Sequence, residues 1–287
     1  MQIALGTANF GNKYGLNFKK NINRNKDLSN LLKVAKKFNI NILDTSPNYN
    51  IKKNLIDYKE FRKFSIISKL KFTNKEKKNK NLEKIFLKKI LDIKKKYKIK
   101  IFYAILLHRS EDINIFKKKK IIEIIRYLKE EKICKKFGVS VYDPSEVKKI
   151  YKIWKPDIIQ LPMNVLDNRF FKSGWLDKLY KSGIEIHVRS VFLQSLLLVD
   201  YKKILKKFYQ NKLILKKFED YCKVKNRSKL DMCLNHIKKF KQISCMVVGV
   251  QNIVQLKAIL FSFEKKLFKS NFKFQKVNKK IIDPRLW

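Results

Sequence analysis

The strongest constraint on the fold is a repeated alternation of short apolar runs with longer amphipathic stretches along the chain. The short runs have the length and the Val, Ile and Leu content of buried strands. There are eight of them, at residues 3–7, 41–45, 65–69, 102–108, 136–140, 158–161, 185–190 and 245–249. Strands that alternate with helices form a parallel sheet, and eight such units close into a barrel. The sequence therefore predicts the α/β class and, within it, a (β/α)8 TIM barrel.

The stretches between the predicted strands have the spacing of amphipathic helices, because apolar residues recur three and four positions apart. The clearest of these stretches cover residues 27–38, 81–97, 115–131 and 213–224. Pro144 follows Asp143 after the fifth predicted strand, and proline suits the first turn of a helix. We expect a helix to begin there as well.

The length of the chain suits one barrel. It has 287 residues, and an α/β barrel commonly uses about 250 residues as one unit. No stretch rich in Pro, Ser or Gly offers a linker, and no internal repeat exists beyond the alternation of strands and helices. We expect residues 1–287 to form a single domain.

The net charge of +45 suggests nucleic-acid binding at first sight. The composition argues against a specific nucleic-acid partner, because 61 of the 69 basic residues are Lys and only 8 are Arg. Proteins that read nucleic acids favour Arg for its bidentate fork. The lysines are also dispersed in short runs, mostly on predicted outer helices. We expect a solvated basic surface that attracts anionic ligands over long range.

Cysteine spacing and the first residues bear on the cellular compartment. The cysteines Cys134, Cys222, Cys233 and Cys245 have neither metal-ligand nor redox spacing, so we expect reduced thiols and no metal site. The first six residues lack a basic leader followed by an apolar core, and no apolar run approaches the roughly 18 residues of a membrane helix. We expect a cytoplasmic protein without membrane contact, as a monomer or weak homo-oligomer.

Polar residues stand where three of the predicted strands end. Asp44 and Tyr49 follow the second strand five positions apart, Lys69 closes the third and His108 closes the fourth. Each has a simpler explanation when taken alone: packing for Tyr49, chance for Lys69 as one of 61 lysines, helix capping for Asp44 and a core position for His108. The carboxyl ends of barrel strands are where such folds keep their chemistry. The four residues together therefore indicate a catalytic site.

The order of these residues along the chain resembles the aldo-keto reductase family. The resemblance begins with the Leu-Gly-Thr-Ala-Asn-Phe-Gly run at residues 5–11 and extends nearly to the end. It includes Asp44 with Tyr49, Lys69, His108, the run at 137–140, Ile159 with Gln160, Arg189 with Ser190, and Val248 with Gly249. The resemblance implies an NADP-dependent oxidoreductase that reduces an aldehyde or ketone, with NAD as the alternative cofactor.

Residues 188–194 and the ending at 283–287 look like a bacterial branch of this family that is often linked to sugar and cell-surface polysaccharide metabolism. A sugar-derived carbonyl is therefore one candidate substrate. The substrate itself is not readable, because pockets in this architecture are built from variable loops. Here those loops are residues 10–23, the stretch after Lys69, residues 164–174 and the tail at 283–287.

The chemistry of carbonyl reduction explains why Tyr49, Lys69 and Asp44 belong together. The reaction needs a proton for the developing alkoxide, and a tyrosine with an ordinary pKa near 10 is a poor donor at neutral pH. A nearby ammonium lowers that pKa, and a buried ammonium needs a carboxylate partner. Tyr49 would then be the proton donor. The resemblance gives His108 the task of binding and orienting the carbonyl.

The resemblance also implies a set of cofactor-binding residues. Gln160 and Ser140 match residues that hold the nicotinamide carboxamide, and Arg189 stands where many members have an aromatic residue stacked on the nicotinamide. The remaining positions are Gly6 and Thr7 in the opening run, Ser190, Leu193 and Gln194 along the pyrophosphate, and Gly249, Gln251, Asn252 and Gln255 at the adenosine phosphate end. A helix that begins after Gly249 would suit a phosphate through its free N–H groups.

Several positions depart from the family pattern. Val141 replaces an asparagine, Ser195 replaces a glycine and Ile259 replaces another asparagine. No arginine stands at the loop after Gly249, where Lys257 is the nearest cation.

A rival fold and a rival function need consideration. A Rossmann dinucleotide fold is not supported, because Gly6, Gly11 and Gly15 do not form the G-x-G-x-x-G fingerprint. A barrel that binds cofactor for regulation or redox sensing without turnover is the second rival. Such a binder need not keep Asp44, Tyr49, Lys69 and His108 together, so the complete set favours an enzyme.

Overall fold

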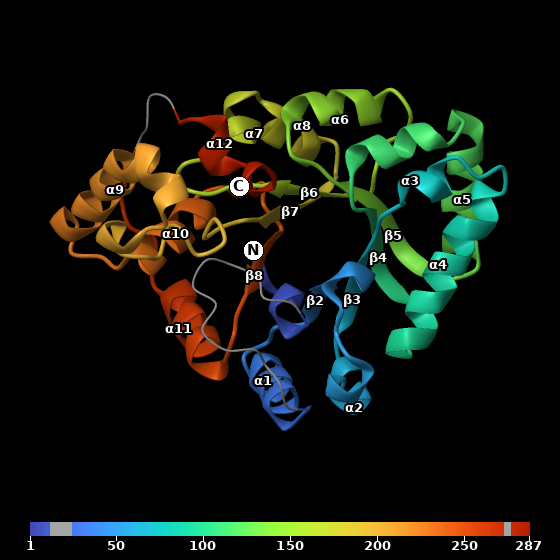
Figure 1. The fold of residues 1–287 in the computed structure, drawn as a ribbon, viewed down its shortest axis with the longest axis horizontal. Coiled ribbons are helices and arrows are strands. Elements are labelled where there is room, and N and C mark those ends of the chain that lie inside the picture. Colours follow the sequence, from blue (N-terminus) through green and yellow to red (C-terminus); the bar gives the residue numbers. More distant parts are fainter. Residues whose placement is uncertain (12–24, 273–276) are drawn as a thin grey trace.

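Eight parallel strands pair in sequence order and the last pairs with the first, so the sheet closes into a barrel (Figure 1). The computed structural model describes residues 1–11, 25–272 and 277–287. The strands are β1 Gln2–Gly6, β2 Ile42–Thr45, β3 Ser65–Leu70, β4 Phe102–Leu107, β5 Cys134–Ser140, β6 Ile158–Pro162, β7 Glu185–Arg189 and β8 Cys245–Gly249. The predicted TIM barrel is confirmed, and each predicted strand is present within a few residues of its expected bounds.

Helices surround the barrel and cover the outer faces of the strands (Figure 1). They are α1 Asn25–Lys37, α2 Tyr58–Phe61, α3 Asn74–Lys77, α4 Leu82–Tyr97, α5 Lys118–Glu130, α6 Pro144–Tyr151, α7 Arg169–Lys172, α8 Trp175–Lys181, α9 Lys212–Val224, α10 Lys229–Lys238, α11 Ile253–Glu264 and α12 Lys279–Ile282. The helices expected at 27–38, 81–97 and 213–224 are confirmed. The helix expected at 115–131 begins later, because Ser110–Ile115 forms a separate 3-10 helix.

Helix α6 shows how local sequence sets an element boundary. Pro144 is its first residue, and the side chain of Asp143 accepts a hydrogen bond from the backbone N–H of Ser145. Proline fits the first turn because that position has no intrahelical hydrogen bond to lose. The expected start of this helix is confirmed, and it follows directly on the carboxyl end of β5.

The barrel has two apolar regions. The larger one lies between the strands and the helices and contains fully buried aromatic side chains such as Phe86, Phe102 and Phe137. The smaller one lies inside the barrel, where alternate strand residues meet: Ala4, Ile42, Ile67, Ala104, Leu106, Ile158 and Cys245. A filled interior of this kind is usual for an eight-stranded barrel, so the barrel is a packed core and not a pore.

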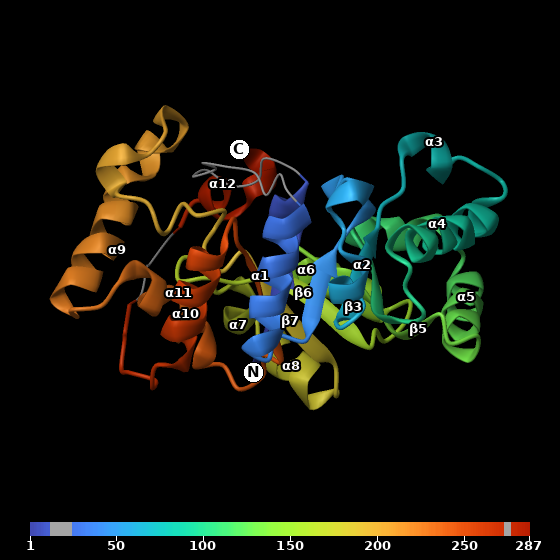
Figure 2. The ribbon, with the colours of Figure 1, turned by 90° about the horizontal axis from the view of Figure 1, so that it is seen from below.

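The tail of the chain lies at the carboxyl end of the barrel. Figure 2 shows α12 and the C-terminus at one end of the molecule and the N-terminus, from which β1 starts, at the other. After α12, Pro284–Leu286 form a 3-10 helix, and the ring of Trp287 packs 4.7 Å from that of Phe208. These contacts hold the tail beside the strand ends that carry polar residues.

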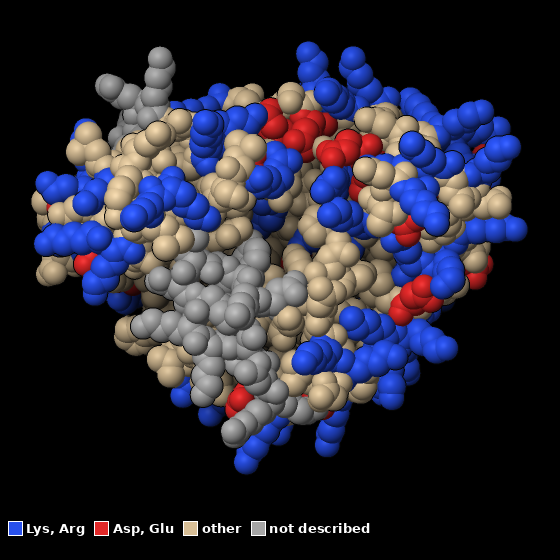
Figure 3. Space-filling model, viewed as in Figure 1, with Lys and Arg blue, Asp and Glu red and all other residues tan. Residues whose placement is uncertain are grey.

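Basic side chains are spread around the periphery of the face shown in Figure 3. Their dispersal agrees with the expected solvated surface. All four cysteines are buried and unpaired. Among the helices of the described residues, none has both the length and the apolar character needed to cross a bilayer.

Candidate active site

The period of two along each strand explains why polar side chains gather at the mouth of the barrel. Ile42, Ile67 and Ile158 pack in the barrel interior, and successive side chains on a strand point to opposite faces. Two residues further along, at the carboxyl ends, the inward positions are Asp44 on β2, Lys69 on β3 and Gln160 on β6. The same alternation directs His108 inward, because it lies two residues after the interior residue Leu106 and one residue after the end of β4. Four strands thus direct polar groups toward one point.

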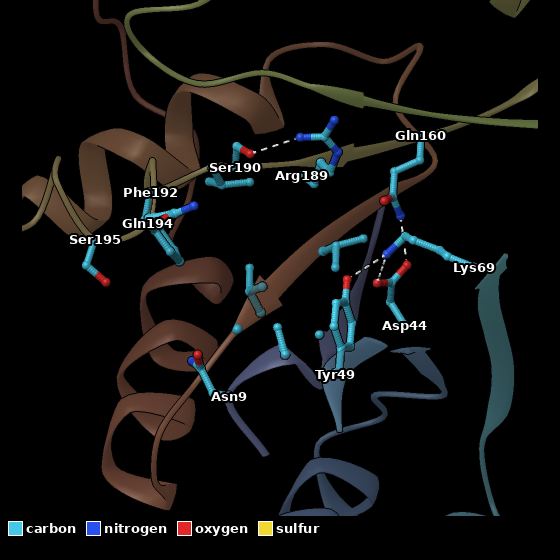
Figure 4. A pocket seen from close by; sticks show the side chains of 16 residues that line it. Asn9, Asp44, Tyr49, Lys69, Gln160, Arg189, Ser190, Phe192, Gln194 and Ser195 are labelled. Atoms are coloured by element: carbon cyan, nitrogen blue, oxygen red, sulfur yellow. Dashed lines mark hydrogen bonds and ion pairs between the residues drawn. The ribbon is translucent and has the colours of Figure 1, made fainter. Parts of the chain in front are cut away.

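Lys69, Asp44 and Tyr49 form a connected chain at that point (Figure 4). The ammonium of Lys69 forms a salt bridge with Oδ1 of Asp44 and donates a hydrogen bond to the Tyr49 hydroxyl at 3.3 Å. Oδ2 of Asp44 accepts a second hydrogen bond, from Nε2 of Gln160, at 2.8 Å. Lys69 is only 3% exposed and Asp44 2%. The two charges therefore compensate one another away from water, as a buried pair must.

The pKa values of this chain reflect burial and mutual charge. Burial alone would lower the pKa of Lys69, but the opposing effects of Asp44 and Tyr49 raise it above its ordinary value, so Lys69 is fully charged. Burial raises the pKa of Tyr49, and the Lys69 ammonium lowers it by less. The expected net lowering of the Tyr49 pKa was therefore wrong, because desolvation outweighs the lysine. Tyr49 keeps its proton at neutral pH, and Lys69 limits the cost of losing it.

His108 is a neutral imidazole beside these charges. Burial, and after it the positive charges of Lys69 and Arg189, lower the pKa of His108 to about 3. Its Nδ1 atom is buried without a hydrogen-bond partner, and its backbone N–H donates to the carbonyl of Leu70. A neutral ring with an unused polar atom can donate to or accept from a ligand without competing with a protein partner.

Tyr49 is positioned by a tight local turn. It ends the 3-10 helix Pro47–Tyr49, which the side chain of Ser46 caps by accepting from the backbone N–H of Asn48. The neighbouring loop approaches this turn so closely that a Cβ atom added at Gly11 would lie 2.2 Å from the carbonyl oxygen of Tyr49. Only glycine fits there. Gly11 therefore lets the loop after β1 fix the backbone that carries the Tyr49 ring.

A cavity at the mouth contains most of the residues that the sequence indicated. Tyr49, Lys69, Gln160, Arg189, Ser190 and Gln194 line both of its parts. One part extends to Gly6, Asp44 and Gly249, and the other extends to His108, Ser140 and the tail residues Pro284 and Arg285. Within the described residues, no group of three His, Cys, Asp or Glu side chains is arranged to bind a metal ion.

Comparison with known proteins adds a decisive observation to this geometry. The sequence model of the aldo/keto reductase family matches residues 2–279. This chain belongs to the aldo/keto reductase family. It is therefore an oxidoreductase of the kind that reduces small carbonyl compounds with NADH or NADPH. No protein with a curated description matches its sequence significantly.

Solved structures of other reductases share the fold. An aldo-keto reductase from Bacillus halodurans, in its holo form, superposes with a TM-score of 0.73 at 16% identity, over 93% of this chain and 88% of that one. Its apo form gives a TM-score of 0.69 at 17% identity, over 89% of each chain. The glycerol dehydrogenase from Gluconobacter oxydans gives 0.70 at 15% identity, over 93% of this chain and 87% of that one. At such identities the likeness concerns the fold alone.

Two buried polar atoms show that the reductase cavity suits a nicotinamide cofactor. Oε1 of Gln160 and Oδ1 of Asn9 are both buried, and neither has a hydrogen-bond partner in the structure. Both residues line the cavity (Figure 4). A buried acceptor without a hydrogen bond destabilises the protein, so a ligand that donates amide N–H groups to these two atoms would be bound favourably. The Nε2 atom of Gln160 is occupied by Asp44, which leaves Oε1 for such a ligand.

The loop after β7 has an unusual backbone that faces the same cavity. Leu193, Gln194 and Ser195 all adopt positive φ angles, of 48°, 52° and 73°, and Ser190 does so at 59°. Consecutive left-handed residues are rare outside glycine, and such strain gathers at ligand-binding loops. Ser195 stands in this conformation where the family pattern has glycine. Ser190, Gln194 and Ser195 line the cavity.

A further hollow continues the cavity toward helix α11. Its lining includes Gly249, Gln251, Gln255 and Ile259, and it shares Phe192 and Ser195 with the cavity. Asn252 caps α11 by accepting from the backbone N–H of Gln255. No charged residue among the described ones lines this hollow, and Lys257 is exposed outside it.

Three predicted cofactor residues do not line these hollows. Thr7 is fully buried and its hydroxyl donates to Thr45 at 2.9 Å, so it joins β1 to β2. Leu193 is also fully buried, and Asn252 is occupied as the helix cap. Conversely, the sequence reasoning assigned no individual role to Asn9, Tyr142, Phe192 or Arg285, which do line the hollows, although it counted the tail that carries Arg285 among the substrate loops. Asn9 was present in the opening run and could have been named, whereas the other three depend on loop and tail paths.

Proposed function

We propose that this protein reduces an aldehyde or ketone to the alcohol with NADPH, and that Tyr49 is the proton donor. The observation that supports the proposal best is the buried chain from Asp44 through Lys69 to the Tyr49 hydroxyl, at a cavity with unsatisfied amide acceptors. A sugar-derived carbonyl is one candidate substrate.

The proton step follows from the pKa values. When bound, the cofactor supplies a hydride to the carbonyl carbon. Tyr49 carries its proton at neutral pH and gives it to the carbonyl oxygen, so that hydride and proton together convert the carbonyl to an alcohol. The phenolate that remains is stabilised by the Lys69 ammonium at 3.3 Å, because an opposite charge at that distance favours the ionised form. Solvent then returns a proton to Tyr49.

Asp44 and His108 prepare the site for that step. Asp44 keeps Lys69 charged and oriented, since an unpaired ammonium so deeply buried would lose its proton or its place. His108, uncharged and with a free ring nitrogen, would bind the carbonyl oxygen next to Tyr49. Two hydrogen bonds to one oxygen fix the carbonyl and favour the negative charge that develops there.

The cofactor would extend from Gln160 to helix α11. Gln160 and Ser140 would hold the carboxamide, and Ser190 and Gln194 on the left-handed loop would follow the pyrophosphate. Gly249, Gln251 and Gln255 would receive the adenosine end, beside Gly6, which pairs with Gly249. Buried Thr7 and Leu193, and Asn252 as the cap of α11, would support these segments without lining the cavity. NADPH would be preferred through the overall charge of +45, and NADH would also bind, because no charged residue lines the described part of the adenosine hollow.

A panel of aldehydes and ketones with NADPH consumption as the readout tests the proposal. We expect turnover of at least one compound and loss of that turnover in Tyr49→Phe. Fluorescence titration with NADPH should be run in parallel. Tight NADPH binding without turnover of any carbonyl compound would contradict the proposal and favour a regulatory barrel.

A further inference from the structure

The substrate side of the cavity has a positive charge that no carboxylate balances. The guanidinium of Arg189, at the end of β7, donates hydrogen bonds to Oγ of Ser140 and Oγ of Ser190, both at 3.3 Å, and to the carbonyl oxygen of Val141 at 3.0 Å. All three acceptors are uncharged. No Asp or Glu among the described residues forms an ion pair with Arg189, although it is half-buried. Charges withdrawn from water usually have a counterion, so the Arg189 guanidinium favours the binding of an anion.

A second guanidinium stands next to it, brought by the tail. The Cζ atom of Arg285 lies 3.5 Å from the ring centroid of Tyr142, and that of Arg189 lies 3.9 Å from the same centroid. Both guanidinium groups therefore pack against the same aromatic ring. We call Arg189, Tyr142 and Arg285 the arginine–tyrosine stack. Cation–π contacts with this one ring keep the two like charges near each other.

The arginine–tyrosine stack borders the same part of the cavity as the proposed catalytic groups. Tyr49, His108, Tyr142, Arg189 and Arg285 all line it, and its described lining includes no acidic residue. The charge of Lys69 is offset by Asp44.

Arg285 is itself paired, since its Nη2 donates to Oδ2 of Asp283 at 2.6 Å. Arg189 therefore leaves a net positive charge, and Arg285, 46% exposed, remains within reach of an incoming ligand. The low pKa of His108, to which Arg189 contributes after burial and Lys69, agrees with a positive field inside the cavity.

We propose that the carbonyl substrate carries an anionic group, a carboxylate or a phosphate, which the arginine–tyrosine stack binds while the carbonyl oxygen lies at Tyr49 and His108. The inference rests on the proposed carbonyl reduction and adds the class of substrate. Guanidinium groups suit it, because their planar donors match carboxylate and phosphate oxygens in pairs. The net charge of +45 would attract any anion, so the test must separate the effect of the arginine–tyrosine stack from that of the general field.

Matched pairs of substrates make that separation. Succinic semialdehyde is compared with its methyl ester, and glyceraldehyde phosphate with glyceraldehyde, each with NADPH at about 0.15 M salt, where the Debye length is about 8 Å. The readout is the ratio of kcat/KM for the anionic member to that for the neutral member. Arg285→Met removes one charge at the stack. Arg126→Met removes one charge from the exposed surface of α5 and is the control.

We expect the ratio to favour the anionic member in at least one pair and to fall roughly tenfold or more in Arg285→Met, as loss of a charged hydrogen bond predicts. The pair that responds identifies a carboxylate or a phosphate. Arg126→Met should leave the ratio unchanged. Arg285→Lys keeps the charge but not the planar fork, so its ratio should lie between those of wild type and Arg285→Met. Arg285→Lys is used in place of Arg285→Met if the latter does not fold.

Two results would overturn the inference while leaving carbonyl reduction intact: equal kcat/KM for both members of each pair, or the same ratio in Arg285→Met as in Arg126→Met. Loss of all turnover, by contrast, would count against the proposed function. Ligand-observed NMR then decides the substrate class without turnover. Binding of succinic semialdehyde or glyceraldehyde phosphate that weakens in Arg285→Met alone supports the stack, and binding equal in both variants contradicts it.

Discussion

The ammonium of Lys69 lies 3.3 Å from the hydroxyl of Tyr49 and forms a salt bridge with Asp44 on its other side. This arrangement joins a proton donor to a charge that is itself held in place, and all of it lies at the carboxyl ends of β2 and β3. Lys69 affects Tyr49 in two ways, since it favours the phenolate and fixes the hydroxyl, yet burial of Tyr49 still dominates its pKa. Catalysis in this account depends on the stabilised phenolate and not on a tyrosine that ionises at rest.

Breaking the Lys69–Asp44 pair should cost stability and activity together. Lys69→Met leaves Asp44 buried without a cation, and Asp44→Asn leaves Lys69 without its anion. Removing one partner of a buried pair costs about 3 kcal/mol in free energy of unfolding, measured by denaturant titration. Turnover should fall in both variants. Unfolding free energies and rates equal to those of wild type would show that the pair does not support the site.

The same pair should make the stability of the folded protein decrease at alkaline pH. The pKa of Lys69 is raised in the folded state, so its contribution is complete below the unfolded value of about 10.4 and is lost as the pH rises above it. The melting temperature of wild type should therefore fall more steeply above about pH 10 than that of Lys69→Met. Parallel curves for the two proteins would contradict a raised pKa for Lys69.

His108 should not titrate near neutrality. Because its pKa is lowered to about 3, the ring is neutral from below pH 5 upward, and kcat/KM should show no inflection near 6.5 from this residue. NMR titration of the ring and a pH–rate curve measure this. The depressed value also means that the folded state resists protonation, so stability declines as the pH falls from about 6.5 toward 3. An inflection near 6.5 that disappears in His108→Gln would refute the assignment.

Gly11→Ala should damage catalysis through the Tyr49 backbone. Its Cβ would lie 2.2 Å from the Tyr49 carbonyl oxygen, so the turn that carries Tyr49 must move. A misplaced catalytic group commonly costs about a hundredfold in rate. Gly183→Ala is the control for general backbone strain, because alanine is strained at the positive φ of Gly183 but its Cβ would have no atom within 4 Å. Steady-state rates at matched folded concentration should separate the two variants, and equal rates would remove Gly11 from the account.

NADPH should bind more tightly than NADH at low salt, and the difference should shrink as salt rises. The net charge of +45 attracts the more anionic dinucleotide, whereas the described lining near α11 carries no charge for the extra phosphate. Fluorescence titration of both cofactors at low salt and at about 1 M salt, where the Debye length is about 3 Å, measures this. A preference that persists at high salt would indicate a local phosphate contact, and tighter NADH binding would overturn the assignment.

The fold and the inner ring of the site were predictable because both follow from local sequence. Apolar runs define the strands, and the period of two then decides that Asp44, Lys69 and Gln160 share the barrel interior. The cap of α6 at Asp143 is equally local. Such features depend on residues that are close together in the chain, so they can be predicted from the sequence.

Features that depend on tertiary packing could not be predicted in this way. The contact of Gly11 with the Tyr49 turn and the arginine–tyrosine stack both join segments whose paths are set by packing far along the chain. The direction of the Tyr49 pKa was missed for a related reason, since desolvation depends on how completely the surrounding residues cover the hydroxyl. The number of nearby charges alone does not give that balance.

The most direct test of the account is the turnover of Tyr49→Phe, which removes one hydroxyl and keeps the ring. A carbonyl compound that wild type reduces is measured with NADPH in both proteins, and NADPH binding is followed by fluorescence to verify that the cavity is intact. We predict nearly unchanged NADPH affinity and a fall in kcat of at least about a hundredfold, the usual contribution of a general acid. Wild-type turnover in Tyr49→Phe would contradict the assignment of Tyr49 as proton donor.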